Sequence, residues 1–178
     1  MEANYFDLET YSKGDKPDPK TDKIITIQFQ KFDLDTGKPL TELQVLKEWE
    51  DGEEEIIKFV YKWFFKRNFW QFLPVGFNLT FEWQFLFEKF KQYGVCNMKY
   101  EDFFNIPQVD LKSVAVVKKG TFIGAKLSSI SGKEDDGNVI KNLYEAKEYD
   151  KILKYIENEA ESFLGMYRKL SETIRKNI

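Results

Sequence analysis

The sequence contains no histidine and only one cysteine, Cys96, among 178 residues. The lack of histidine excludes Ser-His-Asp and Cys-His catalysis, and it excludes histidine as a metal ligand or general base. A single cysteine cannot form an internal disulfide, which suits a reducing compartment. Any catalysis must therefore depend on carboxylates, lysine, tyrosine or serine, or on a metal held by oxygen ligands, for which Mg²⁺, Mn²⁺ and Ca²⁺ are the usual ions.

Long apolar runs and excess positive charge are also missing. No run approaches the roughly 18 apolar residues of a membrane span, and the chain passes directly into a predicted strand, so we expect a cytoplasmic protein with no signal peptide and no membrane partner. The net charge of −3 gives no overall attraction to nucleic acid, so such binding would need local basic patches or bridging cations. With 42% hydrophobic and 17% aromatic residues, residues 1–178 are expected to form one domain with a packed core.

The hydrophobic pattern predicts three strands followed by alternating helices and strands. Strands are expected at 5–10, 23–30 and 43–49, with a hairpin turn at 35–38. Next come a helix at 53–70, a strand at 72–77, a helix capped by Thr80 and running to about Tyr93, and a strand at 106–110. Residues 110–117 are expected to be helical, 118–138 loop-rich, and 139–178 two helices that break near 146–149. This order predicts an α/β fold, with a mixed five-stranded sheet flanked by helices.

Two carboxylates lie close together in the first predicted strand. Alternation places Tyr5, Asp7 and Glu9 on one face and Phe6 and Leu8 on the other. Carboxylates this close repel each other, and burial would remove their hydration, so the arrangement is costly unless a divalent cation binds. The same pattern also describes an exposed strand end with two solvated acids, and this segment alone does not decide between them.

The last predicted helix carries one carboxylate, Glu159, within a packing stripe. The stripe follows steps of three and four along Ile152, Tyr155, Ile156, Glu159, Phe163, Met166 and Leu170. A carboxylate there must be neutral, paired or bound to a cation, unless it lies at the boundary and reaches water. Tyr155 precedes it by one turn, so its hydroxyl can lie beside that carboxylate. A further acid, Glu82, falls in the first turn of a helix, where the helix dipole favours acids in any case.

These three segments together resemble the three motifs of the DEDD 3′–5′ exonucleases. This family is a branch of the ribonuclease-H-like superfamily that includes polymerase proofreading domains. Phe6-Asp7-Leu8-Glu9-Thr10 matches the first motif, and Asn78-Leu79-Thr80-Phe81-Glu82 resembles the second. Tyr155-Ile156-Glu157-Asn158-Glu159 resembles the third motif of the tyrosine subclass (DEDDy). The resemblance covers nearly the whole chain, and it is strongest to stand-alone relatives of the family B DNA polymerase proofreading domain.

The resemblance implies a ribonuclease-H-like fold and a metal-dependent 3′–5′ exonuclease acting on single-stranded DNA or RNA 3′ ends. Two Mg²⁺ or Mn²⁺ ions would be held by Asp7, Glu9, Glu82 and Glu159, with Asp7 contacting both ions. Tyr155 would orient the attacking water by its hydroxyl. The terminal nucleotides would contact Leu8, Thr10, Asn78 and Phe81. Glu82 and Glu159 depart from the family, which has aspartate at both places, so each of these carboxylates reaches one methylene further.

Other interpretations of the same residues remain open. The two glutamates also fit a weakened or inactive exonuclease-like module that binds nucleic-acid ends or a protein partner. A ribonuclease-H-like nuclease that cuts internally is a further alternative, against which Tyr155 argues. Lys118-Lys119 and the Lys20/Lys23 pair could contact a nucleic-acid backbone, although most surface lysines are simply solvated. The aromatic run at 63–70 is better explained by core packing, with exposed members available for a protein partner or homodimer.

Overall fold

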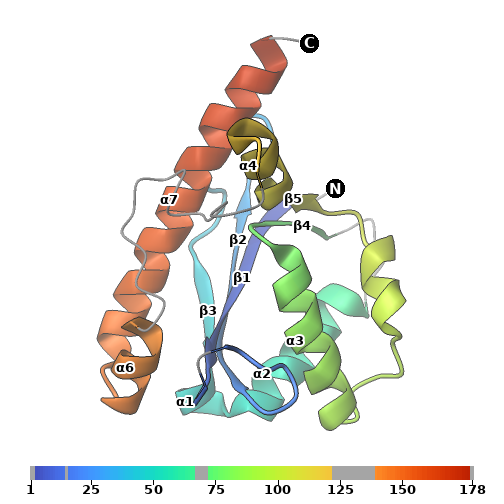
Figure 1. The fold of residues 1–178 in the computed structure, drawn as a ribbon, viewed down its shortest axis with the longest axis vertical. Coiled ribbons are helices and arrows are strands. Elements are labelled where there is room, and N and C mark those ends of the chain that lie inside the picture. Colours follow the sequence, from blue (N-terminus) through green and yellow to red (C-terminus); the bar gives the residue numbers. More distant parts are fainter. Residues whose placement is uncertain (1–2, 15, 67–71, 122–138, 177–178) are drawn as a thin grey trace.

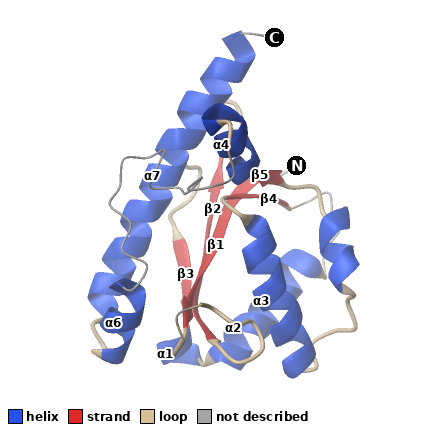
Figure 2. Cartoon of the chain, in the orientation of Figure 1, coloured by secondary structure: helices blue, strands red, loops and turns tan. Residues whose placement is uncertain are grey.

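The computed structural model describes residues 3–14, 16–66, 72–121 and 139–176, and its centre is one five-stranded sheet. The strand order is β3-β2-β1-β4-β5, with helices on both faces (Figures 1 and 2). The strands are β1 (Ala3–Tyr11), β2 (Lys23–Phe32), β3 (Gln44–Lys47), β4 (Leu73–Gly76) and β5 (Val109–Asp110). β1, β2 and β3 pair antiparallel, whereas β4 and β5 add in parallel. The predicted mixed α/β sheet is thereby confirmed.

The helices follow the predicted order with local differences. They are α1 (Glu48–Asp51), α2 (Glu53–Val60), the π-helical η1 (Tyr61–Phe65), α3 (Leu79–Gln92), the 3₁₀ helix η3 (Tyr100–Asn105), α4 (Leu111–Lys119), α6 (Val139–Glu145) and α7 (Tyr149–Lys176). The break between α6 and α7 falls where the sequence predicts it. Residues 67–70 of the expected first helix and 122–138 of the expected loop lie outside the described residues.

Several predicted boundaries are wrong, and one of them is the fifth strand, which covers only Val109–Asp110 and not 106–110. The third strand ends at Lys47, and Trp49 lies instead in α1, where its ring stacks on Tyr149 with centroids 4.4 Å apart. Thr80 does not cap α3, because the helix begins at Leu79 and its N-cap is Asn78, two residues before Thr80. The loop predicted from 118 begins later, since α4 continues to Lys119.

Alternation along β1 separates two packed cores. Phe6 and Leu8 are buried on the face covered by α2 and α3. Ala3 and Tyr5 are buried on the opposite face, against Phe163 and its neighbours in α7. The central strand therefore places the side chains of Tyr5 and Asp7 toward α7, the element that carries the third predicted motif.

A buried ion pair joins α2, α3 and β2. Glu53 Oε1 accepts a hydrogen bond from the Ile24 N–H at 2.7 Å and lies 3.1 Å from Lys89 Nζ. Its Oε2 atom accepts the Tyr93 hydroxyl at 2.7 Å. Both members of the pair are almost fully buried, so removing either one would leave the other charge buried without a counter-charge.

Replacing Glu53 by glutamine is expected to lower the free energy of unfolding by about 3–5 kcal/mol, because the buried Lys89 ammonium loses its counter-charge. Urea unfolding at neutral pH measures the effect. Glu54→Gln is the matched control, since the ion pair of Glu54 with Lys58 is exposed and such pairs contribute about 1 kcal/mol or less. Equal losses in the two variants would contradict this account of the pair.

Within the described part of the chain, every helix is too short or too polar to cross a lipid bilayer.

Candidate metal centre

Asp7 lies where β1 loses its neighbouring strand on one side. β4 pairs with β1 only as far as Tyr5, and the chain then leaves the sheet. It turns at Asn78, whose φ of 72° is left-handed, and α3 begins beside β1. Glu82, in the first turn of α3, thereby lies beside the Asp7 carboxyl group, close enough for the charge of Asp7 to raise its pKa. Because β4 ends early, the chain leaves the sheet beside Asp7, and the first two predicted motifs lie next to each other.

α7 supplies the third motif from the face of β1 that carries Asp7. Carboxylate oxygens of Asp7, Glu9 and Glu159 all lie within 4.8 Å of one another. Tyr155, one turn before Glu159, is hydrogen-bonded to that carboxylate. Burial, followed by the charges of Glu159 and Glu9, raises the pKa of the Tyr155 hydroxyl, so it remains protonated at neutral pH. The structure therefore groups Asp7, Glu9 and Glu159 with Tyr155 beside them, whereas Glu82 lies next to Asp7 but outside that group of three carboxylates.

Glu82 is the most deeply buried of these acids. Only 3% of the residue is exposed, and its Oε2 atom is buried without a hydrogen-bond partner among the described residues. Burial, and then the charge of Asp7, raises the pKa of Glu82 well above its ordinary value. Burial also raises the pKa of Asp7. A buried carboxylate oxygen without a partner, beside a cluster of acids, fits oxygen ligands for a hard divalent cation.

Two residues that the sequence reasoning did not assign to the site hold Asp7 in place. The Tyr5 hydroxyl and the Gln28 side-chain amide each donate to Asp7 Oδ2 at 3.0 Å. These hydrogen bonds lower the pKa of Asp7, against the larger effect of burial. The sequence does indicate that Tyr5 lies near Asp7, since the alternation of side chains in a strand puts both residues on the same face. Gln28 lies directly opposite Asp7 in the β1–β2 register, which a sequence alone does not fix.

The second motif is held from β5 and α4. The Asp110 carboxylate accepts the backbone N–H groups of Asn78 and Leu79 at 2.8 and 3.0 Å. The Asn78 side-chain oxygen accepts from Lys112 Nζ at 2.7 Å. Gly76 completes the turn, because a Cβ there would lie 2.8 Å from the Phe6 carbonyl oxygen. The physical reason why Thr80 is not the cap is that Asp110, more than thirty residues away, satisfies the free N–H groups.

The residues predicted to contact nucleotides are placed as follows. Leu8 is buried in the core on the face of β1 opposite Asp7. Thr10 is half-buried beyond Glu9, and Phe81 packs its ring against Phe85 at 4.9 Å in the first half of α3. Asn78 is engaged by Lys112, as described above. Contact of any of them with a nucleotide stays a prediction.

The lysines and the aromatic residues considered for nucleic-acid contact differ in their surroundings. Lys23 pairs with Glu48 at 2.8 Å, whereas the Lys20 side chain is exposed. In the aromatic run, Phe65 is buried as predicted, but Trp63 is 41% exposed and lies 5.7 Å from the Phe59 ring. The Lys118 side chain and residues 67–70 lie outside what the structure describes.

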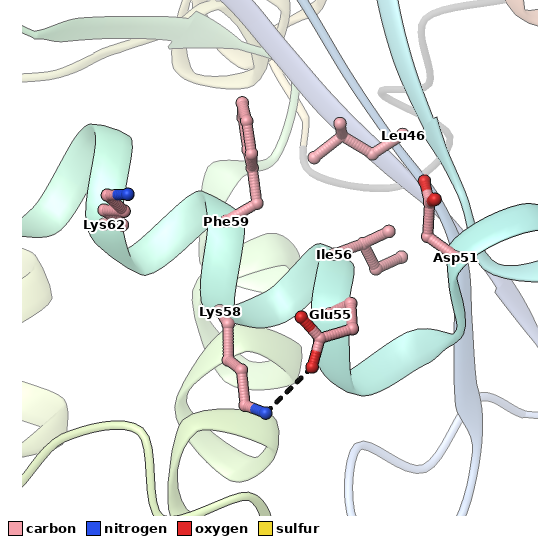
Figure 3. Close-up of a pocket in the computed structure, with 7 residues that line it drawn as sticks. All are labelled: Leu46, Asp51, Glu55, Ile56, Lys58, Phe59 and Lys62. Atoms are coloured by element: carbon pink, nitrogen blue, oxygen red, sulfur yellow. Dashed lines mark hydrogen bonds and ion pairs between the residues drawn. The ribbon is translucent and has the colours of Figure 1, made fainter.

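A hollow of about 450 Å³ lies near Phe59, between β3 and the α1–α2 segment. Figure 3 shows its lining residues, with Lys58 paired to Glu55 beside it. The lining consists of Leu46, Asp51, Glu55, Ile56, Lys58, Phe59 and Lys62. It contains none of the clustered acids, so it is separate from the candidate metal centre.

Several solved structures share this fold. The family B DNA polymerase of the hyperthermophilic archaeon Pyrobaculum calidifontis matches with a TM-score of 0.69 at 17% identity, over 96% of this chain and 24% of the polymerase chain. An exonuclease I bound to the inhibitor BCBP and a zinc-bound E. coli exonuclease I–ssDNA complex each match with a TM-score of 0.60 at 10% identity, over 94% of this chain. This chain spans 40% and 39% of those two chains.

The sequence itself matches no protein family model and no curated protein. The structural likeness defines the class of fold: an α/β architecture, with a mixed five-stranded sheet flanked by helices, that is shared with these exonuclease and polymerase structures. It extends over nearly all of this chain but only part of the others, and at such low identity it establishes the fold alone.

Proposed function

We propose that this chain is a metal-dependent 3′–5′ exonuclease that hydrolyses the terminal phosphodiester of single-stranded nucleic acid. The observation that carries the proposal is the convergence of four acids and a tyrosine from three distant segments. Asp7 and Glu9 come from β1, Glu82 from α3, and Tyr155 and Glu159 from α7. The fold shared with exonuclease I, one structure of which is a complex with single-stranded DNA, supports the choice of substrate.

The reaction requires a water oxygen to bond to the phosphorus of the last phosphodiester while the bond to the 3′-oxygen of the preceding nucleotide breaks. The products are a nucleoside 5′-monophosphate and a strand shortened by one nucleotide with a 3′-hydroxyl. Two divalent ions, Mg²⁺ or Mn²⁺, bound by Asp7, Glu9, Glu82 and Glu159 would supply the charge that lowers the pKa of the water and stabilises the leaving oxygen.

The chain's own groups then have separate roles. Tyr155 is protonated at neutral pH, so its hydroxyl acts as a hydrogen-bond donor or orienting group and not as a base. Its contact with Glu159 fixes its position one turn away on α7. Glu82, which is almost fully buried beside Asp7, would contribute its carboxylate to a cation there.

The test is release of nucleotides from 5′-labelled single-stranded DNA and RNA oligonucleotides in Mg²⁺ or Mn²⁺. We expect a ladder that shortens from the 3′ end, no reaction in EDTA, and no cutting of circular single-stranded DNA. Cutting of the circle would favour an internally acting nuclease. No release from either substrate with either metal would reject the exonuclease proposal.

A binding module is the second candidate, and the observation that favours it is the presence of glutamate at 82 and 159, where the resembling family has aspartate. Catalytic groups need placement within about 0.5 Å, so an extra methylene at two ligands could abolish turnover. Glu82→Asp/Glu159→Asp tests this candidate. Activity in the double variant but not in the parent would support the binding module.

A further inference from the structure

We propose that Tyr5 and Gln28 are positioning residues for the metal centre, which hold the Asp7 carboxylate so that its Oδ1 atom ligates the cation. The inference rests on the proposed function, because it assigns the way in which this chain orients the central ligand of that site. Neither residue belongs to the three motifs, and neither is a carboxylate. Both act through Asp7.

The geometry of the two hydrogen bonds sets the orientation of Asp7. Tyr5 Oη and Gln28 Nε2 both donate to the same oxygen, Oδ2, each at 3.0 Å. A carboxylate oxygen has two lone pairs, and two donors occupy them. Oδ2 is therefore taken up by these two donors, and Oδ1 is the oxygen that they leave available for a cation.

The orientation of Gln28 is itself fixed. The Thr26 hydroxyl donates to Gln28 Oε1 at 3.1 Å, so the amide must turn its NH₂ group toward Asp7. Thr26 and Gln28 are both fully buried, and in the β1–β2 register they lie opposite Glu9 and Asp7. A buried polar chain with every group satisfied is rigid, which is the property required of groups that support a ligand.

Tyr5 also connects Asp7 to α7. Its ring packs against Phe163 with centroids 4.8 Å apart, and Phe163 lies one turn after Glu159. The ring therefore contacts the helix that carries two site residues, while the hydroxyl holds the ligand on β1. A phenylalanine at position 5 would preserve the packing, so the hydroxyl is the part of Tyr5 that serves the metal centre.

The test is a Mn²⁺ titration of the parent, Tyr5→Phe and Gln28→Met, measured by calorimetry and by the electron paramagnetic resonance signal of free Mn²⁺. Loss of a group that orients a metal ligand typically lowers metal affinity about 10–100-fold, and we expect an effect of this size in each variant. Nucleotide release should show a reduced kcat with little change in the KM for the oligonucleotide, since neither side chain is placed to contact it.

Tyr167→Phe is the matched control. Tyr167 packs in the same core as Tyr5, and its hydroxyl donates to the Leu34 carbonyl at 2.8 Å. Its removal should lower the melting temperature in a similar way and leave Mn²⁺ affinity unchanged. If Tyr5→Phe and Gln28→Met also lose only stability and bind Mn²⁺ as the parent does, the positioning role is rejected while the exonuclease proposal stands.

The remaining outcomes are distinguishable. A parent that binds Mn²⁺ but releases no nucleotide would reject the exonuclease function, and weaker Mn²⁺ binding by the two variants would still support the positioning role. A parent that binds no Mn²⁺ at millimolar concentration would overturn the positioning role along with the metal centre.

Discussion

Replacing Asp7 by asparagine is expected to reduce the release of nucleotides by about 1,000-fold or more, with the fold preserved. The metal ions stabilise the transition state by several kcal/mol, and each 1.4 kcal/mol corresponds to a factor of ten in rate. Asparagine retains an oxygen that can accept the hydrogen bonds from Tyr5 and Gln28, but it lacks the negative charge that a shared ligand of two cations requires.

The measurement is single-turnover release from a labelled oligonucleotide in Mn²⁺, together with thermal unfolding in EDTA. Asp7→Asn should melt at or above the parental temperature in EDTA, because the substitution removes a carboxylate that is destabilised by burial. Glu161→Gln, at an exposed acid of α7, is the control and should retain activity. Parental rates in a clean preparation of Asp7→Asn would contradict the assignment of Asp7 as the central ligand.

The first and third motifs were predictable from local sequence, because each depends only on the side-chain repeat of one strand or one helix. Alternation of side chains in one strand places Asp7 and Glu9 on one face, and helical spacing places Tyr155 beside Glu159. In the structure, carboxylate oxygens of Asp7, Glu9 and Glu159 lie within 4.8 Å of one another, and Tyr155 lies beside Glu159. That these acids meet at all depends on α7 covering the face of β1 that carries Asp7, which strand and helix periods do not specify.

Two features that the sequence did not predict, the start of α3 and the contact of Gln28 with Asp7, depend on contacts between residues that are distant along the chain. Asp110 determines the start of α3 by accepting the N–H groups of Asn78 and Leu79, so the local preference of Thr80 for capping has no effect. Gln28 reaches Asp7 because the register of β1 and β2 places the two residues directly opposite each other. These are tertiary constraints, and a pattern of residue types carries no direct record of them.

The unfolding free energy of the metal-free protein is expected to fall as pH rises above about 4, since Glu82 and Asp7 both have pKa values raised by burial. The unfolded carboxyl groups titrate near pH 4. Between that value and the folded pKa, the native state binds more protons than the unfolded state, so the slope of stability against pH is negative. The contribution is fully present below the unfolded pKa and is lost as pH rises through the folded pKa.

Glu82→Gln should remove most of this slope. The variant should be more stable than the parent at pH 8 in EDTA, by about 1.4 kcal/mol for each unit by which folding raises the pKa of Glu82, and the two curves should converge near pH 4. Urea unfolding between pH 4 and 8 measures both curves. Saturating Mn²⁺ should reverse the order at pH 8, because the parent gains binding free energy that the variant has partly lost. If the stability of the parent is constant or rises with pH, and the variant is no more stable than the parent, then ionised Glu82 does not destabilise the folded protein.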